Sequence, residues 1–226
     1  MTRKSENKQI PLLFRFVLQL LGLLWLAGMP FILLLRVSVW VHVHYQPYAW
    51  LSILVGAMAM SLVLWGYFLF LHQQFVKKII RPKAMQRNYA VLFVLVLAYC
   101  GNSIWSISTY NVKEEALKVE FRKLHPVLRL GIGTLILLEK ELLLTDAERQ
   151  PEDYQQMGLA SKRYSLHYEQ SSGYVHAVDI RTKGHSWLRN SLIQGYFKLM
   201  GFNTLLHRGT APHLHVSLPC RGLKGV

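Results

Sequence analysis

The sequence predicts an α+β protein with three N-terminal transmembrane helices followed by a small domain built on an antiparallel sheet. Two observations support this prediction. Long stretches without charge occupy the first half of the chain, and in the second half short apolar segments alternate with helical patterns and turn residues. We therefore expect residues 1–110 to form a membrane domain and residues 111–226 to form a second domain, whose size is normal for a single domain.

The uncharged stretches cover residues 16–35, 48–71 and 89–107. About 20 apolar residues are enough to cross the hydrocarbon core of a bilayer, so each stretch is predicted to be a transmembrane helix. The first stretch is too long for a cleavable signal, and no small-residue cleavage site follows it. The lipid bilayer is therefore an expected partner of the chain.

The basic residues of the first half predict how the chain is oriented. Residues 1–110 hold 10 Lys and Arg against one acidic residue, and only Arg36 lies between the first two stretches. The loop before the third stretch is strongly basic, with Lys77, Lys78, Arg81, Lys83 and Arg87. Positive loops stay on the cytoplasmic side, so we expect a multi-pass protein of a bacterial inner membrane with a cytoplasmic N-terminus and a periplasmic C-terminal domain.

The predicted membrane topology explains the net charge of +14. Basic loops set topology and attract anionic lipid head groups, which accounts for most of the excess. The chain shows none of the aromatic and basic patterns typical of nucleic-acid recognition, so we expect no nucleic-acid partner.

The first part of the C-terminal domain is predicted to be mainly helical. Residues 111–124 are charged with apolar residues at helical spacing, which indicates an amphipathic helix, and the apolar residues 127–138 indicate a buried one. Residues 141–145 are predicted to form a short core strand. Residues 151–158 are typical of a loop or a short helix.

The second part of the domain is predicted to supply most of the sheet. Residues 163–168 and 174–181 indicate two strands on either side of a turn-rich segment. Residues 186–200 have helical periodicity, and the glycine at 201 ends the helix. Residues 202–207 and 213–218 are expected to form a closing hairpin.

Histidines and one carboxylate in this second part suggest a metal site. His213 and His215 are two residues apart on one expected strand, so they share a face, and Asp179 lies near the end of another strand. Two imidazoles and one carboxylate form a common ligand set for catalytic zinc, with the fourth position left for water. Zinc-activated water is the nucleophile of many hydrolases, so this pattern favours a zinc-dependent hydrolase.

The third ligand has two candidates. His176 is only three residues before Asp179, and side chains on a strand alternate, so the two point to opposite faces unless a bulge intervenes. His167 lies on the preceding expected strand, where a longer hairpin can bring it beside Asp179. We therefore favour His167, Asp179 and His215 as zinc ligands, with His176 as the alternative to His167.

The order of these segments resembles the LAS-type zinc peptidases, a family that includes D-alanyl-D-alanine carboxypeptidases and dipeptidases and L-alanyl-D-glutamate endopeptidases. The resemblance covers about residues 120–218 and none of the membrane part. It rests on Thr145-Asp146-Ala147-Glu148-Arg149, Ser165-Leu166-His167, Ala177-Val178-Asp179-Ile180, the helix of residues 186–200, and His213-Leu214-His215. The resemblance implies a zinc peptidase of peptidoglycan stem peptides in which Arg149 holds a substrate carbonyl or carboxylate. Ser165 is expected either to bind substrate or metal-site groups through its hydroxyl or to cap a turn.

The chain departs from this family at two points. The family usually has six residues between its ligand His and Asp, whereas His167 precedes Asp179 by twelve positions. Many members also carry a Glu shortly before the last His as general base, and none precedes His215 here. His213 is the expected base in its place, because imidazole suits proton transfer near neutral pH.

Alternative interpretations remain open at this point. A non-catalytic domain of the same fold that binds cell-wall peptide or a partner protein is the alternative to a peptidase. Asp179 could instead pair with Arg149 or Arg181 in a structural ion pair. His42 and His44 have a spacing that suits a metal, but we interpret them as residues of the membrane interface.

Overall fold

The computed structural model describes residues 12–46, 48–76, 80–105, 107–150, 164–209 and 211–220. Three long helices come first: α1 (Leu12–Tyr45), α2 (Ala49–Phe75) and α3 (Pro82–Trp105). All three are long and apolar enough to cross a membrane, so the chain is a membrane protein. The helices are longer than the uncharged stretches: α1 and α3 continue past charged residues, and α2 continues past His72 to Phe75.

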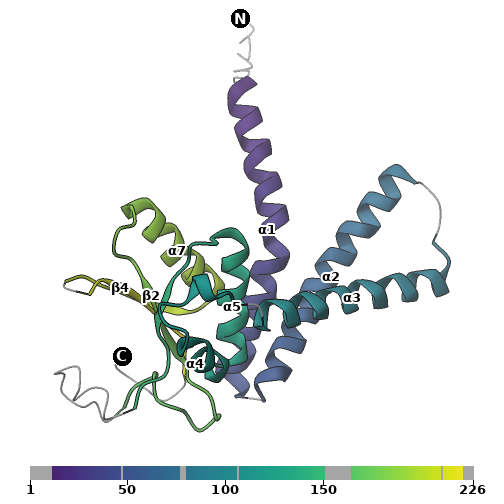
Figure 1. Ribbon diagram of the computed structural model, residues 1–226. Coiled ribbons are helices and arrows are strands. Elements are labelled where there is room, and N and C mark those ends of the chain that lie inside the picture. The colour runs from purple at the N-terminus through teal and green to yellow at the C-terminus, as the bar shows by residue number, and fades with distance from the viewer. Residues whose placement is uncertain are drawn as a thin grey trace, which may run out of the picture.

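Most of the buried residues of the three long helices lie toward one common end. These residues lie in the last half of α1, the first half of α2 and the last half of α3, while the rest of each helix exposes apolar side chains. Figure 1 shows the helices diverging from this common end, which lies beside α5 (Pro126–Leu138). Gly56 makes the close contact of α1 with α2 possible, since a Cβ there would clash with Ser38 Oγ and Leu34 O.

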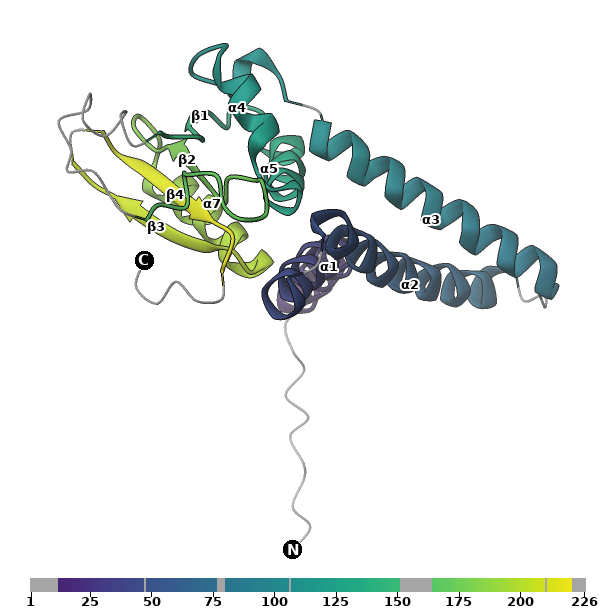
Figure 2. The ribbon, with the colours of Figure 1, turned by 90° about the horizontal axis from the view of Figure 1, so that it is seen from below.

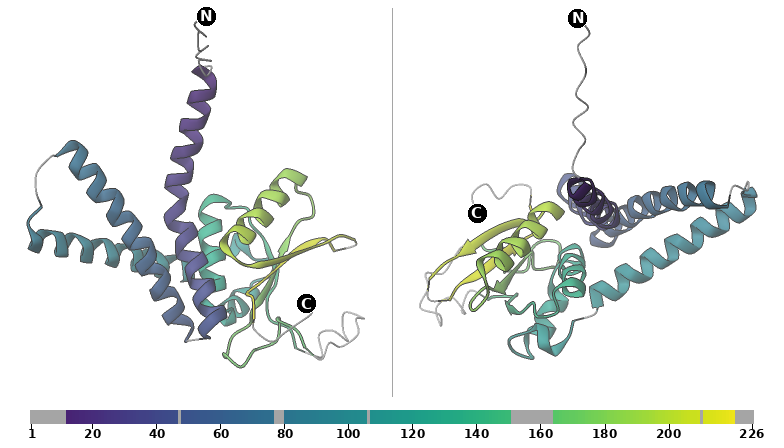
Figure 3. Two further views of the ribbon diagram at one scale, coloured as in Figure 1. Left: turned by 180° about the vertical axis from the view of Figure 1, so that it is seen from behind. Right: turned by 90° about the horizontal axis from the view of Figure 1, so that it is seen from above.

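Helix α5 joins the long helices to the rest of the fold. His125 is its N-cap and accepts a bond from Val127 N, and Pro126 follows at the first helical position, where a missing N–H costs nothing. The buried Arg129 donates to the carbonyl oxygen of Ile104 near the end of α3, from Nε at 3.2 Å and from Nη2 at 2.8 Å. Figures 2 and 3 show α5 lying between the long helices and the sheet.

The sheet has four antiparallel strands in the order β1-β2-β4-β3. These strands are β1 (Leu144–Asp146), β2 (Ala177–Arg181), β4 (His213–Ser217) and β3 (Asn203–His207). Helix α7 (Trp187–Met200) precedes β3; Ser186 caps its start, and Gly201, with φ of 99°, ends it in the left-handed region. The α+β class, the small antiparallel sheet and the closing hairpin are as predicted.

Other predicted elements need correction. A strand was expected over residues 163–168, but the described residues 164–168 form a turn in which Tyr168 N donates to Ser165 O. The strand expected at residues 141–145 is β1 at 144–146, because the Asn111 amide binds the carbonyls of Lys140 and Leu142 and keeps that segment out of the sheet.

The helix expected over residues 111–124 is shorter, at α4 (Leu117–Lys123), with the single turn η1 (Thr109–Asn111) ahead of it. The strand expected over residues 174–181 begins later, at Ala177. The prediction for residues 151–158 lies outside the described residues.

Candidate metal centre

The sheet register brings the polar residues of three strands to one face. Asp179 on β2 lies directly opposite His215 on β4, and it also pairs with Asp146 on β1. Residues opposite each other in an antiparallel pair share a face, and so does His213, two residues before His215. Asp179 is almost fully buried, whereas His213 and His215 are partly exposed. Exposure to solvent therefore increases across the site, from a buried carboxylate to accessible imidazoles.

His167 reaches the same site from a loop rather than from a strand. Two loop segments hold each other there, because Arg149 N donates to His167 O at 3.0 Å. His167 Nδ1 lies 2.7 Å from Ala147 O. A carbonyl oxygen can only accept, so Nδ1 carries the ring proton of His167 and Nε2 presents a lone pair. Such a second bond is the usual way in which a ligating histidine is oriented.

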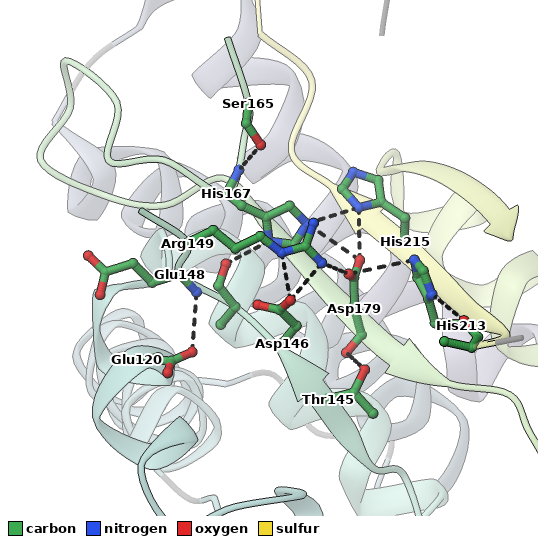
Figure 4. Close-up of polar contacts among 12 residues, drawn as sticks. Glu120, Thr145, Asp146, Glu148, Arg149, Ser165, His167, Asp179, His213 and His215 are labelled. Atoms are coloured by element: carbon green, nitrogen blue, oxygen red, sulfur yellow. Dashed lines mark hydrogen bonds and ion pairs between the residues drawn. The ribbon is translucent and has the colours of Figure 1, made fainter. Parts of the chain in front are cut away.

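The three favoured ligand atoms lie close together (Figure 4). His167 Nε2 is 3.2 Å from His215 Nδ1 and 3.4 Å from Asp179 Oδ1, and His215 Nδ1 is 2.9 Å from Asp179 Oδ1. Tetrahedral zinc with bonds of about 2.0–2.1 Å separates its ligands by roughly 3.3 Å. The donor set and its spacing fit a metal ion with only small adjustments.

The proton on His215 distinguishes two states of this group. A hydrogen bond to Asp179 Oδ1 requires the proton on Nδ1 of His215, whereas metal ligation requires the lone pair on Nδ1 and the proton on Nε2. The same three residues can therefore form either a hydrogen-bonded cluster or a metal site. Metal binding at His215 requires its proton to leave Nδ1.

The surroundings of Asp179 strongly favour its ionised form. Burial by itself would raise the pKa of this carboxyl, but the neighbouring imidazoles of His167, His215 and His213 hold its pKa well below the usual range. Arg149 adds an ion pair, with Nη2 at 2.7 Å from Asp179 Oδ2. The carboxylate thus turns one oxygen to Arg149 and the other to the two imidazoles.

Arg149 is held by two carboxylates. Its Nε and Nη2 both lie 2.6 Å from Asp146 Oδ2, and Nη2 also contacts Asp179 (Figure 4). The predicted substrate clamp therefore forms intramolecular ion pairs, including the pair with Asp179 that remained open as an alternative. Asp146 is a site residue that the sequence reasoning missed, although it stands in the quoted Thr145–Arg149 segment.

His213 lies at the open side of the site. Its Nδ1 is 2.8 Å from Ala211 O, so Nδ1 carries the proton, and its Nε2 is 3.6 Å from Asp179 Oδ2. The ring stacks on His207, with centroids 4.6 Å apart. The lone pair of a neutral His213 therefore faces the group formed by Asp179 and the other two histidines, as a base would require.

Ser165, predicted to bind substrate, makes a local contact. Its Oγ accepts from the backbone N–H of His167 at 3.2 Å, and Figure 4 shows the hydroxyl directed at that nitrogen. This bond supports the turn that presents His167. The role of Ser165 in substrate binding stays a prediction.

His176, the alternative ligand, belongs to a different group. It forms a second buried cluster with His42 and His125, in which one ligand atom from each residue lies within 4.8 Å of the others. Burial first, and the nearby His42, lower the pKa of His176 to about 4. Burial, followed by His42 and His176, lowers the pKa of His125 to about 2. Both rings are therefore neutral in the pH range of a cell.

The sequence reasoning did not find this second cluster. His42 was interpreted as a residue of the membrane interface, but its side chain is buried between α1 and the rest of the fold, whereas His44 is exposed. His125 was only an interruption before the second helix. No local signal joins these residues, because they come from three segments that are far apart in the chain.

Two surface pockets lie away from the histidine–aspartate site. The larger, about 860 Å³, is lined by residues such as Tyr110, Ile136 and His185, and the smaller, about 380 Å³, by residues such as Trp187 and Arg208. Neither is lined by the three favoured ligands. We therefore identify the candidate centre by its metal-ligating atoms and not by a cavity.

Comparisons with known proteins add no family. No protein-family model, curated protein or solved structure matches the chain. The peptidase resemblance thus rests on the order and spacing of its own residues, and the assignment of His167, Asp179 and His215 as metal ligands stays a prediction that their geometry makes chemically reasonable.

Proposed function

We propose that the chain is a membrane-tethered zinc peptidase acting on the stem peptides of peptidoglycan. The observation that carries this proposal is the grouping of His167 Nε2, His215 Nδ1 and Asp179 Oδ1 within 3.4 Å of one another. Zinc bound by these atoms would polarise a scissile carbonyl and activate a water molecule. The resemblance to LAS-type peptidases suggests the substrate class.

His213 is the proposed general base. Its proton sits on Nδ1, held by Ala211 O, so the neutral ring can accept a proton at Nε2. That nitrogen lies 3.6 Å from Asp179 Oδ2 and on the open side of the site. After accepting the proton, the imidazolium would be stabilised by the Asp179 carboxylate and could return the proton to the leaving amine.

Arg149 is the proposed substrate anchor. Its guanidinium is aligned by Asp146 and Asp179, and such a fork suits a carboxylate or a peptide carbonyl. We expect a substrate carboxylate to compete with Asp146, which is the more exposed of the two acidic partners. The Asp179 pair then keeps the guanidinium next to the reacting centre.

The proposed location is a bacterial inner membrane with the peptidase domain in the periplasm. Its support is the placement of Lys and Arg around the three long apolar helices. Alkaline phosphatase fused after Val226 should be active, and a reporter that works only in the cytoplasm should be silent. Activity of the cytoplasmic reporter alone would contradict a cell-wall substrate.

The test of the activity uses the full chain purified in detergent. Incubation with purified peptidoglycan or synthetic stem peptides should release fragments of defined mass, and a chelator should stop the release until zinc is restored. A His215→Gln protein is the matched control and should release nothing. If the zinc-loaded wild-type chain leaves every stem peptide intact, the peptidase proposal is wrong.

A second candidate is a binding domain of the same fold. The observation that favours it is the engagement of Arg149 by two carboxylates, together with the lack of a glutamate shortly before His215. In that case the zinc-loaded chain would be retained on purified cell walls, or would capture a partner, without cutting any peptide. Wall binding measured beside cleavage separates the two functions.

A further inference from the structure

A second group of histidines lies where the long helices meet the sheet domain. His42 comes from the last turns of α1, His125 caps α5, and His176 directly precedes β2. Their ring centroids are 4.4 Å apart for His42 and His125, 5.0 Å for His125 and His176, and 5.5 Å for His42 and His176. The chain thus brings imidazoles from three distant segments to one point.

These three rings are buried without a carboxylate in their group. His42, His125 and His176 are 7%, 1% and 4% exposed. His42 Nδ1 is buried and has no hydrogen-bond partner within the part of the chain that the structure describes. A buried polar nitrogen left unpaired is unfavourable, so packing of the rings alone does not account for this arrangement.

A thiol lies beside the group, next to His176. Cys220 Sγ lies 3.0 Å from His176 Nδ1, and Ser172 Oγ lies 2.8 Å from His176 Nε2. If Nε2 donates to the serine hydroxyl, Nδ1 of His176 keeps a lone pair on the side of the cysteine sulfur. Cys220 is a free cysteine. The sulfur atom therefore lies against one ring of the group, His176, and just outside the three histidines whose ligand atoms lie within 4.8 Å of one another.

We propose that His42, His125, His176 and Cys220 form a second, structural metal site that fastens the end of α1 to the sheet domain. Three imidazoles and one thiolate are a nitrogen and sulfur donor set that zinc prefers, and a closed set of four protein ligands is typical of structural sites. Ligation by His125 Nε2 moves its proton to Nδ1 and displaces the 3.3 Å cap bond from Val127 N. The site does not depend on the proposed peptidase function.

Metal content of the full chain in detergent tests the site. The background is His215→Gln, which disables the first centre. In that background about one zinc per chain should remain, and His42→Gln should remove it. The matched control is His44→Gln, which changes an exposed histidine two residues further along the same helix and should keep the zinc.

Cobalt substitution tests the sulfur ligand directly. With cobalt in place of zinc, the His215→Gln chain should show the near-ultraviolet absorption of a thiolate bound to cobalt, and Cys220→Ser should abolish it. Size-exclusion profiles and helical circular dichroism identify variants that fail to fold. The proposal is overturned if the folded His215→Gln chain holds no metal, if His42→Gln keeps it, or if the thiolate band survives Cys220→Ser.

Discussion

The two histidine clusters of this chain differ in charge and in access. The group around Asp179 contains a carboxylate, is bordered by Arg149, and opens toward the partly exposed His213. The group around His125 contains no carboxylate and is buried on all sides, with Cys220 at its edge. Catalytic metal sites keep an open position, whereas structural ones are closed, so the same residue type points to different roles in the two places.

The clusters also differ in what anchors them. His167 and His215 are organised around a buried carboxylate, whose Oδ1 lies 2.9 Å from His215 Nδ1 and 3.4 Å from His167 Nε2. His176 is organised by a neutral hydroxyl and a thiol. The first group is therefore a charged centre on a sheet face, and the second is a neutral centre at a junction between elements.

The largest effect is expected from Asp179→Asn. The change removes a proposed ligand and leaves Arg149 without its more deeply buried partner, and breaking such a pair costs about 3–5 kcal/mol. Metal at the first centre and all measurable peptide cleavage should be lost, together with a clear drop in the thermal unfolding midpoint. Metal at the second centre should stay. A variant that still cleaves stem peptides would remove Asp179 from the mechanism.

The next effect concerns proton transfer. His213→Ala should lower kcat by about 10²–10⁴-fold, the typical contribution of a general base, while the zinc content stays unchanged. The matched control is His207→Ala, which removes the ring stacked on His213 and should reduce kcat far less. Full activity of the His213 variant would mean that another group takes the proton.

Much of the fold could be predicted because it follows local rules. Uncharged stretches of about 20 residues indicate membrane helices wherever they occur, and the helix and hairpin patterns near the C-terminus produced the elements expected of them. The strand expected at residues 163–168 failed because side chains bind the backbone there. Ser165 accepts from His167 N, and Gln170 donates to the Ser165 carbonyl, so a turn replaces a strand.

The part of the candidate site that could be predicted is the part that follows from the alternation of side chains along a strand. Alternation separates His176 from Asp179, and the structure places them in different clusters. The ion pairs of Arg149 and the carbonyls that orient His167 and His213 depend on how loops fold over the sheet. The second cluster depends on the packing of α1 against the domain, a tertiary event without a local pattern.

A smaller effect is expected on the pH dependence of folding stability in metal-stripped protein, and it distinguishes the two clusters. The pKa of His176 is lowered to about 4 and that of His125 to about 2, in both cases mainly by burial, so the unfolded chain binds more protons than the folded chain below pH 6.5. Stability should therefore fall from pH 6.5 to about pH 4 by about 1.4 kcal/mol per pH unit for each histidine. Thermal unfolding midpoints measured across this range check the slope.

Asp179 should not contribute to that slope. The pKa of Asp179 is lowered, so its stabilising effect is complete above the pKa of an unfolded aspartate, about 3.9, and is lost only below it. His176→Asn should therefore flatten the slope between pH 6.5 and 4, and Asp179→Asn should leave that contribution of the buried histidines in place. An unchanged slope in His176→Asn would show that this histidine is not buried in its neutral form.

The smallest effect is expected from Ser172→Ala. The serine hydroxyl, 2.8 Å from His176 Nε2, fixes which ring nitrogen carries the proton, and loss of such an outer contact typically weakens metal binding by about 10–100-fold. Zinc should leave the second centre at a lower chelator concentration, while the first centre and peptide cleavage are unaffected. Ser171→Ala, one residue earlier and exposed, is the matched control. Because the two centres share no ligand, weaker binding at both centres in Ser172→Ala would mean that they are coupled through the sheet, which the separate ligand sets do not predict.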